Sequence, residues 1–196
     1  MKIVIFGGTF DPPHLGHRRL LDNVIKEIKP DKLIVIPAYV SPFKAETQAG
    51  AGAEQRLRMC ELAFDGVPGL EISDMEIKRG GKSYSYDTIM QLRNQYPGDE
   101  LIFAMGTDQI KSFHGWYRYE EILGMCAIAA FARDDERAAL EAAAAKLRLE
   151  SGGDVRVYSG EPIVISSTLV REGNYEMVSP AVAEYIKSEH LYEKKR

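Results

Sequence analysis

The stretch KIVIFGGTFDPPHLGHRRLLDNVIKEI, residues 2–28, passes from a strand pattern to a helix pattern and decides the fold class. Its first part is an apolar run that ends at a Gly-Gly pair, which permits a tight turn and a close approach of a ligand to the backbone. Pro12 and Pro13 then exclude an early helix, so we expect the helix to begin near Leu15. Its apolar residues recur at helical spacing and form one stripe: Leu20, Leu21, Val24, Ile25 and Ile28.

Four further apolar runs indicate strands, at residues 33–36, 101–105, 125–131 and 155–158. They are nearly continuous in apolar residues rather than alternating, which is typical of parallel strands that are covered on both faces. Helix patterns lie between and after them, at residues 54–64, 86–94, 136–149 and 180–188. The alternation of strand and helix predicts an α/β fold, a doubly wound parallel sheet with right-handed crossovers.

Length and composition limit the classes to which the chain can belong. A length of 196 residues and a hydrophobic share of 45% predict one domain, 1–196, with a small helical part at about 166–196. The net charge of −4 argues against a nucleic-acid partner. No apolar run approaches about 18 residues and no leader pattern opens the chain, so we expect no membrane contact and a cytoplasmic location. Two cysteines without CxxC spacing are expected to be buried thiols, and the sequence is compatible with a homodimer.

Two segments depart from the regular pattern of strands and helices. Residues 37–53 are rich in Pro, Gly and Ala and form a long loop for a compact domain, and such loops are usually functional. Residues 106–119 combine aromatic side chains with a histidine and cations. Both segments follow a predicted strand, and open α/β sheets bind their ligands beyond the carboxyl ends of the strands.

Paired histidines mark the start of the first helix. His17 precedes two residues of the apolar stripe by three and four positions, so it should point into the crevice at the strand ends. His14 precedes the helix and can converge on the same anion as the N–H groups of the first turn. Because His114 and His190 stand alone, no third ligand with metal-like spacing supports zinc. The segment also lacks the GxGxxG and GK[ST] patterns of dinucleotide and P-loop sites.

A run of hydroxyl side chains lies near the C-terminus, in ISSTLVR at residues 165–171. One interpretation is that the hydroxyls only cap a helix. However, no Glu or Gln occurs three residues after any of them, so a capping box does not account for the run. Arg171 adds a cation beside the same helix start. The pattern therefore favours a second anion site, suited to the β- and γ-phosphates of a nucleotide.

The two motifs resemble the signatures of a known family. GTFDPPHLGH is similar to the T/HxGH signature of the nucleotidylyltransferase superfamily, and ISSTLVR is similar to its companion ISSTxxR motif. Several further segments resemble those of the bacterial nicotinate mononucleotide adenylyltransferases: PAYVSPFK, RLRM, SYSYDT, GTD, WY and VAEYIKSEHLY. The resemblance covers essentially the whole chain and implies the Rossmann-like nucleotidylyltransferase fold.

The resemblance also implies a reaction, in which the adenylyl group of ATP passes to the 5′-phosphate of nicotinate mononucleotide. The products would be nicotinate adenine dinucleotide and pyrophosphate, in NAD biosynthesis. His14, His17 and Arg171 would be catalytic, and Mg²⁺ would be held mainly by the ATP phosphates, with no metal site on the protein. Asp108 would reach the ribose hydroxyls, or else cap the helix that follows. The implied ATP-binding residues are Gly7, Gly8, Thr9, Phe10, His14, His17, Gly106, Asp108, Ile165, Ser167, Thr168 and Arg171.

The acceptor side depends on aromatic and polar residues in the middle of the chain. Trp116, the one tryptophan, is either a packing residue or the stacking partner that a pyridine ring needs. Lys44 is either solvated or balances the phosphate of the mononucleotide. Backbone N–H groups near Ser85 and Tyr117 would meet the nicotinate carboxylate. The resemblance implies nicotinate mononucleotide-binding residues Lys44, Ser85, Thr88, Trp116, Tyr117 and Arg133.

Other functions stay open at this point. The chain could transfer an adenylyl or cytidylyl group to another acceptor, such as nicotinamide mononucleotide or phosphopantetheine, although Trp116 with residues 83–88 argues against it. A non-catalytic nucleotide-binding regulator is a second alternative, and it would not need His17. A tRNA synthetase shares the His-rich helix start but needs a longer chain and a basic surface.

Overall fold

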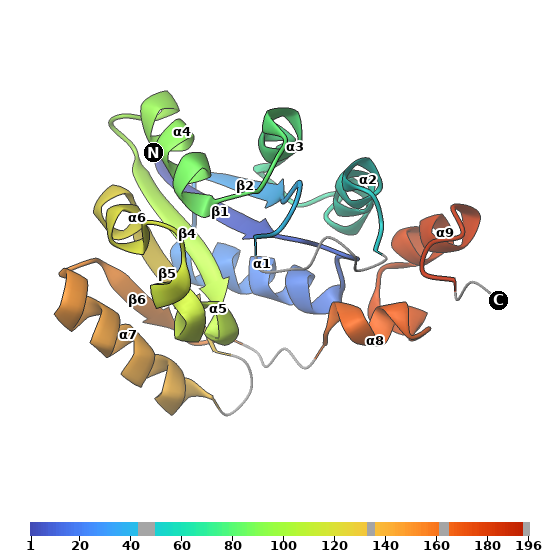
Figure 1. Cartoon of the computed structure of the whole chain (residues 1–196). Helices are drawn as coiled ribbons and strands as arrows, with labels where there is room; N and C mark the ends of the chain where they lie inside the picture. Colours follow the sequence, from blue (N-terminus) through green and yellow to red (C-terminus); the bar gives the residue numbers. More distant parts are fainter. Residues whose placement is uncertain (43–49, 133–135, 161–164, 194–196) are drawn as a thin grey trace.

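The computed structural model describes residues 1–42, 50–132, 136–160 and 165–193. Within these residues, six parallel strands form one sheet with the order β3-β2-β1-β4-β5-β6, so the predicted doubly wound parallel sheet is confirmed (Figure 1). The strands are β1 (Lys2–Gly8), β2 (Lys32–Pro37), β3 (Leu70–Ile72), β4 (Glu100–Gly106), β5 (Ala127–Phe131) and β6 (Val155–Tyr158).

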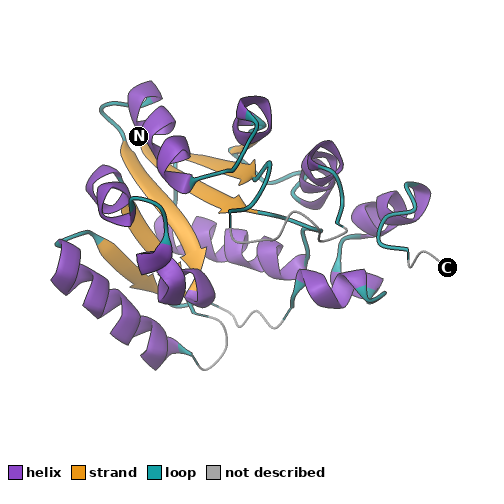
Figure 2. Ribbon diagram, viewed as in Figure 1, coloured by secondary structure: helices purple, strands orange, loops and turns teal. Residues whose placement is uncertain are grey.

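Helices cover both faces of the sheet (Figure 2). They are α1 (Leu15–Ile28), α2 (Ala53–Ala63), α3 (Met75–Arg79), α4 (Ser85–Gln95), α5 (Thr107–Ser112), α6 (Tyr119–Met125), α7 (Arg137–Ser151), α8 (Ser167–Arg171) and α9 (Pro180–Ser188), with short 3-10 turns η1 (Phe113–Gly115) and η2 (Tyr175–Met177). Because side chains alternate along a strand, Ile3 and Ile5 of β1 pack into the core under α4 to α7, whereas Val4 and Phe6 pack against α1 and α2.

The C-terminal part of the chain forms a third, smaller core against the outer side of α2. There, Met59 packs with Val170 of α8 and with Val182 and Ile186 of α9. Figure 1 shows α8 and α9 beyond the arrowheads of the strands, on the side where the ligand site is expected. The described residues of the C-terminal segment therefore reach the carboxyl edge of the sheet, although they contribute no strand.

The position of the site follows from the strand order. The chain passes from β1 through α1 to β2 on one side of β1, and β4 pairs with β1 on its other side. The strand order therefore reverses between β1 and β4, and the connections that follow these two strands lead to opposite sides. The carboxyl ends of β1 and β4 consequently border a crevice. β1 ends at the Gly-Gly pair, and β4 ends at Gly106.

Several expectations about single elements need correction. Residues 106–119, which show no regular pattern in the sequence, contain α5 and η1, and residue 125 ends α6 rather than opening a strand. The edge strand β3 and the short helix α3 were not predicted at all. Elements of three and five residues are too short to show a period. β3 forms because it pairs with β2, and α3 packs against β2. The helix start at Leu15 and the burial of both cysteines are confirmed. Among the described residues, no helix is long and apolar enough to cross a bilayer.

Candidate active site

Two neighbouring cavities lie at the carboxyl edge of the sheet, on either side of the end of β1. The histidine cavity has a volume of about 300 Å³, and its wall includes Phe10, His14, His17, Asp108 and Ser167. The tryptophan cavity has a volume of about 410 Å³, and its wall includes Glu76, Ser85, Thr88, Trp116 and Tyr117. Residues 7–9 contribute to both walls, so the cavities form two halves of one site.

The two histidines are held together at the start of α1. The imidazole rings of His14 and His17 stack with centroids 3.7 Å apart, and the ring of His17 also meets the edge of Phe10 at 5.0 Å. The backbone N–H of His14 donates to Nδ1 of His17 over 3.1 Å. Because Nδ1 accepts, a neutral His17 carries its proton on Nε2. The first turn of α1 contains no acidic side chain, so its N–H groups suit an anion.

Phe10 shapes the loop between β1 and α1. Its backbone has a φ of 50°, in the left-handed region, and its ring is buried against Phe6 and Phe64. A Cβ atom on Gly8 would lie 2.9 Å from that ring, so residue 8 must be glycine for the ring to fit. Phe10 lines the histidine cavity as predicted, but its side chain is also part of the core.

The three hydroxyl side chains of residues 166–168 make different contacts in the structure. Ser166 is the N-cap of α8 and accepts from the backbone N–H of Leu169, which is the capping role considered above. Ser167 donates to the carbonyl of Pro12 over 2.9 Å, and Ile165, Ser166 and Ser167 line the histidine cavity. Thr168 and Arg171 lie further along α8, where Arg171 donates to the Asp11 carbonyl over 2.7 Å and to Oγ1 of Thr168 over 3.1 Å.

A hydrogen-bond network that no sequence pattern indicated supports the same loop from its other side. Arg56 is 4% exposed and donates to the carbonyls of Thr9, Tyr39 and Ala51. Burial lowers the pKa of its guanidinium, and the charge of Asp11 opposes that shift. Oδ1 of Asp11 accepts from the hydroxyl of Tyr192 over 2.7 Å and from the backbone of Ala51 over 3.0 Å. Arg56 and Tyr192 lie in segments that the resemblance singled out, but no sequence signal indicated these contacts.

The end of β4 supplies the far wall of the histidine cavity. Gly106 is the N-cap of α5, and Asp108 is the second residue of that helix. Asp108 is therefore not the cap, and the alternative considered for it is wrong. Asp108 is exposed and lines the cavity, as expected of a residue that reaches a ribose. Gln109, which was not predicted, also lines the cavity, and its Oε1 accepts from the backbone of Gly106 over 3.1 Å.

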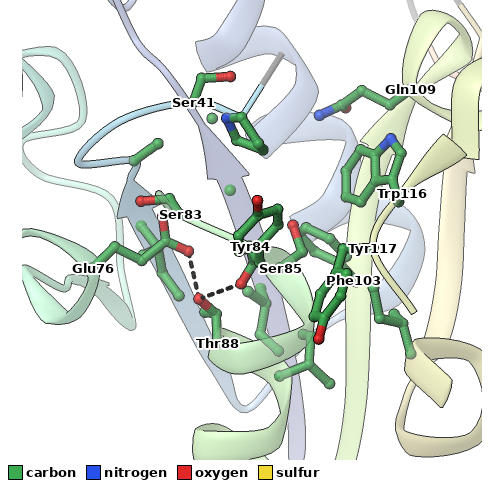
Figure 3. Close-up of a pocket in the computed structure, with 18 of the residues that line it drawn as sticks. Ser41, Glu76, Ser83, Tyr84, Ser85, Thr88, Phe103, Gln109, Trp116 and Tyr117 are labelled. Carbon is green, nitrogen blue, oxygen red and sulfur yellow. Dashed lines mark hydrogen bonds between the residues drawn. The ribbon is translucent and has the colours of Figure 1, made fainter. Parts of the chain in front are cut away.

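Aromatic rings dominate one side of the tryptophan cavity. Trp116 packs on Phe113 at 5.1 Å and on Phe103 at 6.0 Å between ring centroids, and it also faces the cavity (Figure 3). The packing role and the ligand role considered for it are therefore compatible. Tyr117 is 52% exposed and packs on Tyr84 at 4.9 Å. All four described residues predicted for the acceptor lie in this wall: Ser85, Thr88, Trp116 and Tyr117.

A buried acid lies on the opposite side of the tryptophan cavity and was also missed. Glu76 is 7% exposed, and its Oε1 accepts from the hydroxyl of Thr88 over 2.5 Å (Figure 3). Burial raises the pKa of Glu76, while hydrogen bonds from Thr88 and Ser83 and the charge of Arg79 partly offset the shift. The hydroxyl of Thr88 thus donates to Glu76 and also accepts from the guanidinium of Arg79 over 2.8 Å.

Two predicted residues, Lys44 and Arg133, lie outside the described residues. Within the described part of the chain, no group of three His, Cys, Asp or Glu side chains could hold a metal ion.

Comparison with known proteins shows the family to which the chain belongs. A family model described as cytidylyltransferase-like matches residues 5–173. The chain is 34% identical, over 97% of its length and 96% of the relative, to an Oceanobacillus iheyensis protein named "probable nicotinate-nucleotide adenylyltransferase". Two structures of Plasmodium falciparum nicotinic acid mononucleotide adenylyltransferase share the fold with a TM-score of 0.78 each. One is complexed with APC, at 17% identity over 98% of both chains, and the other with NaAD, at 18% identity over 97% of this chain and 96% of that one.

The strand order and the paired histidines beside the end of β1 define a nucleotide-binding α/β protein with a two-part site. The chain belongs to the cytidylyltransferase-like family, and its enzyme class is that of the nucleotidyltransferases.

Proposed function

We propose that this enzyme transfers the adenylyl group of ATP to the 5′-phosphate of nicotinate mononucleotide, giving nicotinate adenine dinucleotide and pyrophosphate. One observation carries the proposal: two cavities of different chemistry share the end of β1. The histidine cavity offers donors for phosphate, and the tryptophan cavity offers an aromatic wall for a flat ring. The name of the Oceanobacillus iheyensis relative supports the same reaction.

ATP would occupy the histidine cavity. The N-terminus of α1 and Nε2 of His17 favour negative charge there, as an α-phosphate requires. Asp108 would accept from the ribose hydroxyls. Arg171 would hold the far phosphates, with its guanidinium beside Thr168. Mg²⁺ would enter with ATP as part of the substrate and would be held mainly by the ATP phosphates, since Asp108 is the one carboxylate among the described residues of this wall.

Nicotinate mononucleotide would occupy the tryptophan cavity, with its pyridine ring against Trp116. Its carboxylate would lie at the start of α4, where the N–H groups of the first turn have no partner within the helix. The N–H groups of residues 87 and 88 bond to the carbonyl of Tyr84, so those of Ser85 and Tyr86 remain at the open end.

The reaction itself needs positioning and charge stabilisation rather than a protein nucleophile. An oxygen of the acceptor phosphate attacks the α-phosphorus of ATP in line and forms the new P–O bond. The bond from the α-phosphorus to the bridging oxygen breaks, and its electron pair leaves with pyrophosphate. Nε2–H of His17 would stabilise the charge that develops on the α-phosphoryl oxygens.

A pyrophosphate-release assay with ATP and a panel of acceptors tests the proposal. Nicotinate mononucleotide should give a higher kcat/KM than nicotinamide mononucleotide and phosphopantetheine, and CTP should not replace ATP. A higher kcat/KM with phosphopantetheine than with nicotinate mononucleotide would reject nicotinate mononucleotide as the acceptor. Turnover with CTP but not with ATP would reject ATP as the donor. We also propose that the reaction takes place in the cytoplasm.

A further inference from the structure

The two cavities share a wall, and its composition points to a residue with no assigned role. Among the described residues, Gly7, Gly8, Thr9 and Gln109 line both cavities. The first three belong to the end of β1 and the loop after it and offer mainly backbone. Gln109 approaches from the other side of the crevice, from the first turn of α5, and it is the long polar side chain of this group.

The orientation of the Gln109 amide is determined by its surroundings. Its Oε1 accepts from the backbone N–H of Gly106 over 3.1 Å, as the third residue of a helix does in a capping box. Because a backbone N–H can only donate, the oxygen must face Gly106, and the two donor hydrogens of Nε2 face elsewhere. Figure 3 shows the amide nitrogen of Gln109 pointing across the tryptophan cavity, toward Ser41.

We propose that Gln109 contacts both substrates where they react, donating from Nε2 to a phosphoryl oxygen between the histidine and tryptophan cavities. The proposal rests on the proposed function, which places the α-phosphate of ATP in one cavity and the acceptor phosphate in the other. Both groups are anions and repel each other as they approach. A neutral amide donor at their junction stabilises the charge on the transferred group, and it does not titrate near neutral pH.

The substitution Gln109→Glu separates this role from helix capping. Glutamate keeps an oxygen for the Gly106 N–H and is an equally good capping residue, so the fold should be retained. It replaces the donor by a negative oxygen, so kcat at saturating ATP and nicotinate mononucleotide should fall about 100-fold or more. The melting temperature should stay within about 2 °C of that of the wild type, because capping is preserved.

Gln55→Glu is the matched control. Gln55 is the third residue of α2, and its Oε1 accepts from the N–H of the N-cap Gly52 over 2.9 Å, as Gln109 does at Gly106. It is absent from both cavity walls as the structure describes them. Gln55→Glu introduces the same negative charge and keeps the same kind of helix cap, so it should leave turnover unchanged.

Gln109→Met provides a second test without added charge. It removes the donor at similar length, so kcat should fall about 10- to 100-fold, while KM for each substrate changes much less. Turnover within about threefold of the wild type in either folded variant would overturn the assignment, as would an equal loss in Gln55→Glu. A rise in KM for ATP alone, with kcat unchanged, would also reject the placement of Gln109 between the two substrates. Wild-type enzyme that releases no pyrophosphate would reject the proposed function instead.

Discussion

The hydroxyl of Tyr192 connects the C-terminal part of the described chain to the loop that leads into the paired histidines of α1, and the effect of removing it can be predicted quantitatively. Tyr192 donates to Oδ1 of Asp11 over 2.7 Å, across 181 positions of sequence. Burial and the neighbouring Asp11 charge raise the pKa of Tyr192, so the hydroxyl keeps its proton and donates at every working pH. Tyr192→Phe removes this one bond and keeps the ring that packs on the small core of α2, α8 and α9.

The magnitude follows from the type of bond. A hydrogen bond to a charged group contributes about 1.5–3 kcal/mol to the free energy of unfolding. For a chain of this length, each kcal/mol shifts the melting temperature by about 2–4 °C. Tyr192→Phe should therefore lower the melting temperature by about 3–12 °C. It should also raise KM for ATP, because Asp11 lies in the loop between β1 and α1 that forms the histidine cavity.

Thermal unfolding of the variant and of a matched control measures this effect. Tyr185 lies on α9 and packs on the same small core, but its hydroxyl makes no hydrogen bond within the described part of the chain. Tyr185→Phe should change the melting temperature by less than about 2 °C. Equal shifts for Tyr185→Phe and Tyr192→Phe would refute the argument, because ring packing rather than the bond to Asp11 would then account for both.

Three further predictions concern the cavities. His17→Ala should lower kcat about 10²- to 10³-fold with the fold intact, as circular dichroism would check, and wild-type turnover would contradict the mechanism. Trp116→Ala should raise KM for nicotinate mononucleotide about tenfold or more and Trp116→Phe much less; an effect on KM for ATP alone would place the acceptor elsewhere. Since the pKa of Glu76 is raised from its ordinary 4.5, the folded state keeps this proton longer than the unfolded state. Wild-type stability should therefore fall relative to that of Glu76→Gln as pH rises above 4.5, and melting curves with a pH-independent difference would contradict this.

The parts of the fold that the sequence predicted are those with a long, regular pattern. The β1 run and the stripe of α1 each extend over enough residues for a period to be visible, because burial on one or both faces selects apolar side chains there. β3 and α5 have three and six residues and show no such period. They exist because neighbouring elements pair with them or cover them, which is information that a local window does not contain.

The residues of the candidate site also fall into those that the sequence predicted and those that it did not. His14, His17 and Ser167 could be predicted because each lies in a compact motif, and the structure brings all three to one cavity. Glu76 and Gln109 could not, because a lone Glu or Gln in a short helix resembles a solvated surface residue. Their significance appears only when the opposite wall of the crevice is in place.

By itself, the sequence determined the class of fold and the residue at which α1 begins, and it predicted an anion site there and the residues that point to nucleotidyl transfer. Those properties depend on neighbouring residues and on local backbone geometry. Only the tertiary structure decided how Ser167 and Arg171 reach the carbonyls of Pro12 and Asp11, 155 and 160 positions away in sequence, and that two cavities share one wall. Such contacts depend on how crossovers and helices pack around a twisted sheet, so no local pattern encodes them.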